Sequence, residues 1–483
     1  MKIPKQCDKS MNFNECELAV LRSAVDLAQE KIGKRNINTP EIQEMITIVE
    51  NFIRRKNLIC YGGTAINNIL PKEDQFYDRD VEIPDYDFFS PNSLEDAKEL
   101  ADIYYERGYT EVEAKSGQHA GTFKVFVNFI AIADITHLPK ELFESIKKES
   151  IRVAGILYTP PNYLRMSMFL ELSRPAGDTD RWEKILKRLT LLNKHYPLVG
   201  KQCATINFQR EFATKINGED YENNIYENVK DTFINQGAVF FGGYALSIYS
   251  KYMPRNLQKI FEKIPDFDVL SNDPETTAEI VKERLKDINV TNVKIVKHEP
   301  IGDVIPVHYE ILVGKDTIAF IFKPAGCHSY NNIHIDGKVV KIATIDTMLS
   351  FYLAFLYADR GYFDPDRILC MSQFLFDVEQ KNRLEQKGVL RRFSITCYGH
   401  QPSIEEIKAE KAAKFKELKD KKGTREYEEY FLSYKPGNIN NNKNFKKEKK
   451  EKKLRKRKTK RAFKEKLFDP YNSKPKPKTR KNK

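Results

Sequence analysis

Apolar residues recur at helical spacing in one early segment of the chain, and a short apolar strand follows them. The helical run extends from Ile42 to Ile53, with apolar side chains at three- and four-residue intervals. Thr39 before Pro40 is typical of an N-cap followed by a proline in the first helical position. The apolar residues 58–61 and two glycines come next, so the pattern predicts a helix, a strand and a glycine turn.

The same order of elements returns later in the chain. A helical run at 226–235 precedes the apolar residues 238–241 and a second pair of glycines. Both copies then carry an Asp-aromatic-Asp triplet, at 85–87 and at 266–268, at nearly the same distance from the glycines. Farther on, each has a helix rich in Leu, Met and Phe that leads into a turn containing Gly and Asp. Matches in this order predict two tandem copies of one fold.

These patterns predict an α/β (α+β) protein built from two tandem domains of the same fold. We expect an N-terminal helical segment at 1–40, one copy at 41–200, a second at 201–400, a charged helical linker at 401–442 and a tail at 443–483. The length of 483 residues suits two or three domains. Hydrophobic residues make up 41% and charged residues 31% of the chain, which is typical of a globular protein with a core.

The positive charge of the chain is concentrated at its C-terminal end. The whole chain carries a formal charge of +13, while residues 443–483 hold 21 Lys or Arg and 4 Asp or Glu. The tail alone is therefore +17 and the preceding body is −4. Such a block predicts a disordered segment. It can bind nucleic acid through phosphate contacts, and a localisation signal or a solvated spacer remain alternatives.

Cysteine usage and hydropathy bear on the compartment. No stretch approaches the ~20 consecutive apolar residues of a membrane span, so we expect no membrane association. The first residues lack the apolar core of a signal peptide. The seven cysteines are scattered without Cys-x-x-Cys spacing, which predicts free thiols in a reducing compartment. Cys327, His328 and His334 do not have the spacing of a zinc site.

Three acidic residues of the first copy predict a site for divalent cations. Asp85 and Asp87 flank one aromatic residue in a strand-like context, so both side chains point to the same face. Two carboxylates side by side repel each other unless a cation lies between them. Asp134 ends an apolar run at 123–136 that we expect to be a neighbouring strand, and a lone charge is costly there. Hard ions such as Mg²⁺ prefer these oxygen ligands.

The chemistry that these groups predict is phosphoryl transfer at two metal ions. Three carboxylates can hold two ions about 4 Å apart and clamp an in-line displacement at phosphorus. Gly62 and Gly63, at the start of a predicted helix, let backbone N–H groups approach a triphosphate. Alone, the glycine pair fits a plain turn equally well, and an isolated Asp-x-Asp fits a surface strand. Their order along the chain favours a site.

The second copy retains two of the three acids. It keeps Asp266 and Asp268, but no third acid follows at the expected place. Aligning residues 317–324 with the strand that carries Asp134 puts Lys323 or its neighbours where the acid should be. Because two carboxylates with a cation nearby should hold metal ions poorly, we expect this copy to be degenerate. It would shape an RNA groove or an interface.

The ordered set in the first copy resembles the DNA polymerase β-like nucleotidyltransferase superfamily. The signature of that superfamily is a Gly-Gly or Gly-Ser turn, an Asp-hydrophobic-Asp and a later Asp. Residues 61–67, 165–168, 173–175 and 177–184 look like the poly(A) polymerase catalytic subunits of large cytoplasmic DNA viruses, such as mimivirus and poxviruses. The resemblance extends over about residues 40–400. It implies that metal ions, Mg²⁺ or Mn²⁺, bind at Asp85, Asp87 and Asp134, and nucleotide at Gly62, Gly63, Thr64 and Asn67.

Basic residues in the same region form a second candidate set. Arg181, Lys184 and Arg188 share one helical face by their spacing, and Arg174 precedes them. We expect them to contact the nucleotide triphosphate or the RNA backbone, with a solvated face as the alternative. Trp182, the single tryptophan, is expected in the core rather than beneath a base.

The resemblance also implies a reaction, which is template-independent addition of AMP from ATP to the 3′ end of a single-stranded RNA. It implies a homodimer, and a location in the cytoplasmic viral factory of an infected cell or in the virion. Two alternatives stay open. One is another nucleotidyltransferase of the superfamily, making oligoadenylate or adding uridylate. The other is an RNA-binding scaffold with a relic fold.

Overall fold

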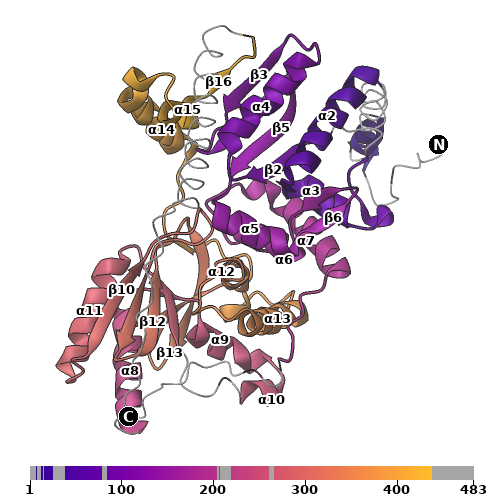
Figure 1. The fold of residues 1–483 in the computed structure, drawn as a ribbon. Helices are drawn as coiled ribbons and strands as arrows, with labels where there is room; N and C mark the ends of the chain where they lie inside the picture. The colour runs from indigo at the N-terminus through magenta and orange to yellow at the C-terminus, as the bar shows by residue number, and fades with distance from the viewer. Residues whose placement is uncertain are drawn as a thin grey trace, which may run out of the picture.

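The computed structural model describes residues 7, 12–14, 16–24, 39–78, 84–203, 206, 219–259, 261 and 266–437. Within these ranges the chain forms two mixed eight-stranded sheets with helices packed around them, one above the other in Figure 1. The prediction of a mixed α/β fold is confirmed. The tail 443–483, most of residues 1–40 and residues 262–265 lie outside the described residues.

The first sheet and its helices come mainly from the first half of the chain. The strand order is β16-β3-β4-β5-β2-β1-β7-β6. The strands are β1 (Ile59–Cys60), β2 (Tyr86–Ser90), β3 (Val112–Ser116), β4 (Thr122–Val127), β5 (Ile130–His137), β6 (Ile151–Val153), β7 (Ile156–Tyr158) and β16 (Ser433–Tyr434). The helices are α2 (Pro40–Lys56), α3 (Gly62–Ile69), η1 (Lys72–Asp74), α4 (Ser93–Glu106), α5 (Lys140–Glu149), α6 (Pro161–Leu172), η2 (Thr179–Arg181) and α7 (Trp182–His195).

The second sheet has the order β10-β11-β12-β9-β8-β14-β13-β15. Its strands are β8 (Val239–Phe240), β9 (Phe267–Leu270), β10 (Val293–His298), β11 (His308–Val313), β12 (Asp316–Phe322), β13 (His328–Ile335), β14 (Lys338–Ala343) and β15 (Cys397–Tyr398). The helices are α8 (Glu219–Asn235), α9 (Gly243–Tyr249), η3 (Ser250–Tyr252), α10 (Arg255–Gln258), α11 (Pro274–Asp287), α12 (Ile345–Phe355), α13 (Pro365–Lys381) and η4 (Gly388–Leu390).

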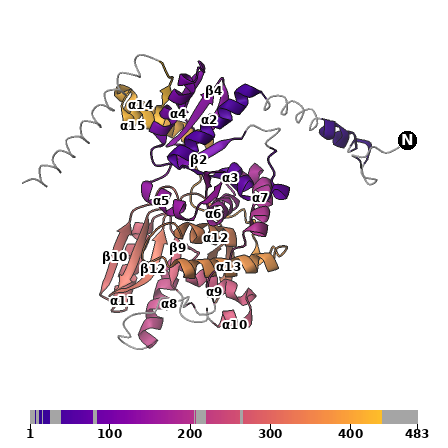
Figure 2. The ribbon, with the colours of Figure 1, turned by 45° about the vertical axis from the view of Figure 1, so that its right-hand side comes forward.

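The two sheets repeat one topology. Strands β3-β4-β5-β2-β1-β7-β6 of the first correspond in order to β10-β11-β12-β9-β8-β14-β13 of the second. In both, the strand after the Gly-Gly helix pairs parallel with one neighbour and antiparallel with the other. The prediction of two tandem copies is therefore confirmed, while the domain limits stay a prediction. The copies meet where α6 packs against α12, as both views show (Figures 1 and 2).

Helix α2 begins where its sequence predicts. The Thr39 hydroxyl accepts a hydrogen bond from the Ile42 amide at 3.4 Å, which satisfies one of the amides that a helix start leaves unpaired. Its apolar face buries Met45, Val49 and Ile53 completely. This packing fixes α2 against the sheet, and β1 and the glycine turn follow directly from it.

The run that was expected to be one strand ending at Asp134 is a hairpin. Residues 122–127 form β4, and Asn128 and Phe129 turn the chain with φ of +48° and +65° before β5 begins. Two consecutive residues with positive φ make the tight turn that matches the twist of a hairpin, and Asn tolerates this conformation well. Asp134 consequently lies within β5, which continues to His137, rather than at a strand end.

The charged segment after residue 400 is helical, as predicted, and it returns to the first sheet. It contains α14 (Ile404–Leu418), η5 (Lys419–Lys421) and α15 (Arg425–Phe431). Strand β16 then pairs with β3, and the Tyr434 hydroxyl donates to Asp102 at 2.6 Å. This long-range return was not predicted, because short edge strands leave little trace in a sequence.

The prediction of free thiols is wrong for six of the seven cysteines. Disulfides join Cys7 to Cys16, Cys203 to Cys370 and Cys327 to Cys397, and Cys60 alone is free and buried. The partners lie up to 167 residues apart, so spacing could not reveal them.

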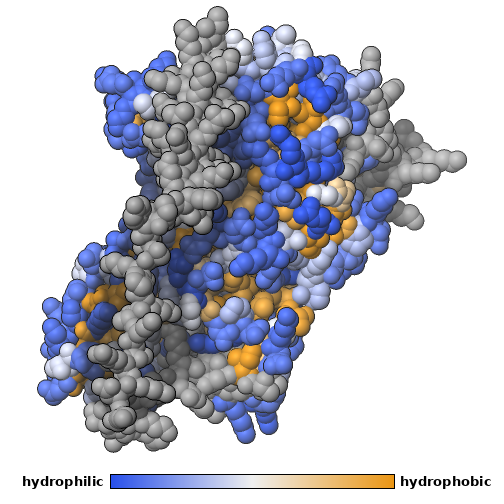
Figure 3. Space-filling view, viewed as in Figure 1, coloured by the Kyte–Doolittle hydropathy of each residue, from blue (hydrophilic) through white to orange (hydrophobic). Residues whose placement is uncertain are grey.

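The surface is mostly hydrophilic. On the face in Figure 3 the hydrophobic residues gather in a few patches, several of them near the junction of the two copies. Within the described ranges, no helix is long and apolar enough to cross a bilayer.

Candidate active site

Strand pairing brings two of the three predicted acids together. β2 and β5 are parallel neighbours, and Asp87 is the register partner of Asp134. Because paired residues of neighbouring strands point to the same face, their carboxylates lie side by side. Asp85 immediately precedes β2 and is exposed, while Asp87 and Asp134 are half-buried. The sequence placed all three acids at one edge, and the structure agrees.

The acids repel one another. Loss of hydration, followed by the charges of Asp85 and Asp134, raises the pKa of Asp87 to about 7. Loss of hydration and the charge of Asp134 also raise the pKa of Asp85. The ammonium of Lys124 on β4 forms an ion pair with one oxygen of Asp134. The other oxygen of Asp134 is buried without a hydrogen-bond partner.

The two glycines form the floor beneath these acids. Gly62 has φ of +71°, and a Cβ there would lie 2.8 Å from Asp87 Oδ2. A side chain at Gly63 would meet the Tyr77 hydroxyl at 2.6 Å. Thr64 donates from its hydroxyl to the Asp85 carbonyl at 2.7 Å, which ties the turn to the strand. Only glycine fits both positions, because space and backbone conformation exclude a side chain.

Asn67 and Arg188 have structural partners beside the turn. Asn67 is buried, and its amide oxygen accepts from the backbone of Phe76 and Tyr77, both at 2.8 Å. Arg188 is also buried, donates to the Tyr77 hydroxyl at 2.6 Å and lies 4.7 Å from the Phe76 ring centroid. The guanidinium is thus held next to Gly63, where a phosphate bound at the turn would meet it.

The other basic residues of the set differ in exposure. Arg181 is half-exposed and lies 3.4 Å from the Glu171 carboxylate, and its charge lowers the pKa of Asp87. Lys184 is exposed one turn into α7. Arg174 is mostly buried with an unpartnered Nε, away from this group and next to the second copy at Gly326.

The donor set fits divalent cations. An orphaned carboxylate oxygen on Asp134 and a repelling pair at Asp85 and Asp87 are what a hard cation satisfies. Among the described residues, no three His, Cys, Asp or Glu side chains already converge at metal-binding distance, since Lys124 holds Asp134. A cation would displace this ammonium and draw the acids together.

The second copy lacks the third acid, although not in the way expected. The register pairs Asp268 with Phe320, so Phe320 stands at the position of Asp134, and the assignment to Lys323 is wrong by three residues. The cation nearby is Arg367, which forms an ion pair with Asp266 at 3.1 Å.

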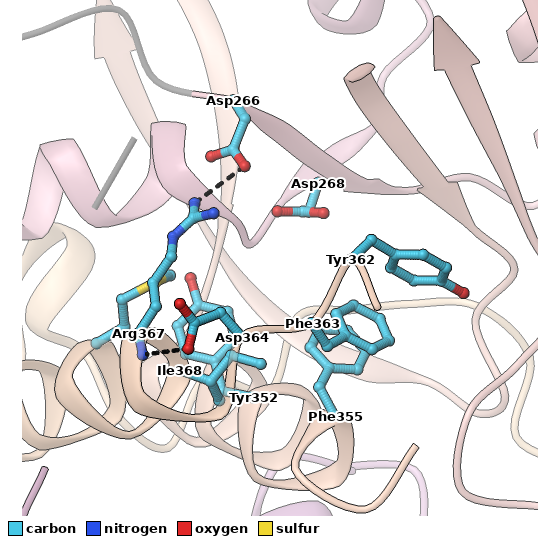
Figure 4. Close-up of a pocket in the computed structure, with 10 residues that line it drawn as sticks. Asp266, Asp268, Tyr352, Phe355, Tyr362, Phe363, Asp364, Arg367 and Ile368 are labelled. Carbon is cyan, nitrogen blue, oxygen red and sulfur yellow. Dashed lines mark hydrogen bonds and ion pairs between the residues drawn. The ribbon is translucent and has the colours of Figure 1, made fainter. Parts of the chain in front are cut away.

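A pocket surrounds this second pair of acids (Figure 4). About 370 Å³ of space, partly open to solvent, is lined by the acids, by Arg367 and by a group of aromatic side chains, namely Tyr352, Phe355, Tyr362 and Phe363. A Cβ on Gly242 would lie 2.0 Å from Asp268 Oδ2, so the acids press onto the glycine turn. The pocket therefore carries an internal cation where the first copy has an open face.

Several partners in the site were missed from the sequence. Lys124, Tyr77 and Glu171 contact predicted residues from elements far along the chain. Lys124 could have been found, because it faces Asp134 across a hairpin whose turn residues are recognisable. Nothing in the local sequence around Tyr77 or Glu171 distinguishes them.

A glycine turn entering a helix, beneath parallel strands that carry paired acids, defines the class as a nucleotidyltransferase-like fold. The whole fold is similar to the crystal structure of the Megavirus polyadenylate synthase, with a TM-score of 0.75 and 21% identity over 93% of this chain and 92% of that one. Residues 47–178 match the family of poly(A) polymerase catalytic subunits.

Relatives provisionally described as poly(A) polymerase catalytic subunits match the same region. One from African swine fever virus is 35% identical over 171 residues, which is 34% of this chain and 36% of the relative. One from Acanthamoeba polyphaga mimivirus is 35% identical over 192 residues, which is 38% and 32%. The chain thus spans about a third of the length of the curated relatives it matches. The resemblance to this viral family is confirmed over that region.

Proposed function

We propose that the protein is a polynucleotide adenylyltransferase. It adds AMP from ATP to the 3′-hydroxyl of single-stranded RNA, without a template, and releases pyrophosphate. The relatives named as poly(A) polymerase subunits support the reaction class, and the nucleotide and acceptor follow from those names.

The pairing of Asp87 with Asp134 above the glycine turn carries the proposal. The acids supply three carboxylates at one strand edge, and the turn supplies backbone amides at the start of α3. A triphosphate bound at those amides would have its reacting phosphate beside the acids. No other function of a soluble scaffold needs this juxtaposition.

Each predicted residue has a role in this scheme. Asp85, Asp87 and Asp134 hold Mg²⁺ or Mn²⁺, which activates the attacking hydroxyl and stabilises the leaving pyrophosphate. Gly62 and Gly63 leave room for the phosphates, and Thr64 fixes the turn to Asp85. Asn67 holds the segment that carries Tyr77, which in turn orients Arg188. Arg188, Arg181 and Lys184 neutralise phosphate charge.

The first copy performs the chemistry and the second supports it. Phe320 opposite Asp268 removes one ligand, and Arg367 neutralises Asp266. A site that already contains a guanidinium has little affinity for divalent cations. We infer that the second copy shapes the groove for RNA.

The test is incubation of the protein with labelled single-stranded RNA, Mg²⁺ or Mn²⁺, and each nucleoside triphosphate separately. The expected result is a ladder of longer RNAs with ATP alone. Extension with UTP instead would assign another transferase of the superfamily. Binding of RNA without extension by any nucleotide would assign the relic scaffold.

We propose two further properties by analogy with the viral relatives. The protein is a homodimer, which sedimentation at micromolar concentration tests, and a monomer there would contradict it. Its place of action is the cytoplasmic viral factory of an infected cell. The three disulfides are unusual for a reducing compartment, so their state in infected cells bears directly on this location.

A further inference from the structure

A short segment between η4 and β15 exposes an unusual set of side chains. Burial alternates strictly along residues 391–395: Arg391, Phe393 and Ile395 are exposed, and Arg392 and Ser394 are buried. Ile395 exposes 86% of its surface and Phe393 exposes 37%. An aromatic and an aliphatic side chain presented beside a cation need an explanation, because a folded chain ordinarily buries such groups.

The alternate residues anchor this segment firmly. Arg392 forms buried ion pairs with Asp346 at 2.9 Å and Glu379 at 3.0 Å. Ser394 donates to the Tyr330 carbonyl at 2.8 Å. The outward-facing side chains are therefore presented from a fixed backbone. Rigid presentation of exposed aromatic groups is typical of binding surfaces rather than of loosely packed loops.

The exposed ring lies at the junction of the two copies, beside the candidate active site. The Phe393 ring centroid is 5.9 Å from that of Trp182, the first residue of α7. Trp182 donates from its indole to the Glu171 carbonyl at 3.0 Å, and Glu171 also holds Arg181. Trp182 is thus not simply a core residue, because its ring backs an exposed phenylalanine next to the acids.

We propose that Phe393, backed by Trp182, is a stacking platform for one base of the single-stranded RNA. Arg391, two residues away on the same exposed face, contacts a backbone phosphate. Ile395 covers the edge of the base. Aromatic rings flanked by cations bind single strands in this way, since every base has a flat face and every linkage a negative charge. This inference rests on the proposed function and names part of its RNA site.

Charge selects RNA over a second copy of the chain as the occupant. Arg391, Arg181 and Lys184 are exposed around the two rings. Across a self-complementary interface these cations would face one another, whereas phosphates would pair with them. The position beside the acids also suits the strand whose 3′ end must reach them.

The single tryptophan of the chain allows a direct test. Because Trp182 is the only indole, its fluorescence reports this junction alone. Titration with an oligoadenylate in the absence of ATP should quench the emission, and a fully paired RNA duplex at the same concentration should not. A strand that binds, measured by anisotropy of a labelled oligonucleotide, without altering the emission of Trp182 would overturn the proposal.

Variants at Phe393 separate stacking from folding. Phe393→Ala and Phe393→Leu should each weaken oligonucleotide binding by about five- to 150-fold, the usual effect of losing one stacked base, and Phe393→Tyr should restore it. The control is Phe415→Ala on α14, where a similarly exposed phenylalanine packs against Phe431. Its RNA affinity should match the wild type.

The outcomes distinguish this inference from the proposed function. If the wild-type protein extends RNA but Phe393→Leu binds it with unchanged affinity, the platform is wrong and the reaction stands. If the wild type extends no RNA, the proposed function fails whatever the variants do. A change of oligomeric mass in Phe393→Leu with unchanged RNA affinity would make this surface a contact between copies and overturn the proposal.

Discussion

Replacing Asp87 by asparagine should stabilise the metal-free protein. Asparagine keeps the shape of the side chain and removes a charge that Asp85 and Asp134 oppose. The pKa rises from the model-compound value of 3.8 to about 7, and about three units correspond to roughly 4 kcal/mol at high pH. Neighbouring groups relax when the charge is present, so we expect a gain of about 2–4 kcal/mol for Asp87→Asn.

The pH dependence has a definite sign. In the unfolded chain Asp87 ionises near its ordinary pKa, whereas in the folded protein it stays protonated up to about pH 7. The penalty on folding is therefore absent below about pH 4, grows as the pH rises and is complete above about pH 7. The stability advantage of Asp87→Asn should follow the same course.

Urea unfolding with a chelator present, followed by the emission of Trp182, measures this. The advantage should be largest at pH 8 and should shrink steadily towards pH 4. The control Asp287→Asn, at a side chain that is 64% exposed, should change the free energy of unfolding by no more than about 0.5 kcal/mol. Added Mg²⁺ should stabilise the wild type more than Asp87→Asn. A variant that is equal to or less stable than the wild type at pH 8 would refute the repulsion on which the cation site rests.

Three other predictions follow from the structure and the sequence. Gly62→Ala should raise the KM for ATP, because its Cβ would crowd Asp87, whereas Gly337→Ala, with similar positive φ and nothing within 4 Å, should lose only stability, about 1–2 kcal/mol in each case; equal KM values would contradict this. Alkylation of the unfolded, unreduced protein should modify Cys60 alone, and mass spectrometry showing more labelled cysteines would exclude the three disulfides. Removal of residues 443–483 should flatten the dependence of RNA affinity on salt by about 0.7 in log–log slope per lost contact, without slowing addition of one nucleotide at saturating primer, and an unchanged slope would leave the tail no role in RNA binding.

Features that depend on local chemistry could be predicted from the sequence. The Thr39 cap, the glycine turn and the strand-borne acids each arise from interactions within a few residues. The repeat was recognisable because both copies keep the same residue types in the same order. Local signals of this kind were sufficient to predict the fold class and to bring Asp85, Asp87 and Asp134 to one edge.

Features that depend on register or on distant contacts could not. Alignment by apolar runs placed Lys323 opposite Asp268, because a strand that is apolar throughout gives no mark of its register, and pairing selects Phe320. The disulfide between Cys203 and Cys370 and the ring contact of Trp182 join segments that are far apart in the chain. Such contacts exist only once the two copies have docked.

The central claim is that the first copy alone performs nucleotide transfer. The most direct measurement is the rate of single-nucleotide addition to a labelled primer by two matched variants, Asp134→Asn and Asp268→Asn. Each removes one strand-borne carboxylate while keeping its shape. Asp134→Asn should slow addition by at least about 10²–10³-fold, because a metal ligand is worth several kcal/mol to the transition state, and Asp268→Asn should retain the wild-type rate within a few-fold. Loss of addition in folded Asp268→Asn, with Asp134→Asn still active, would contradict the account.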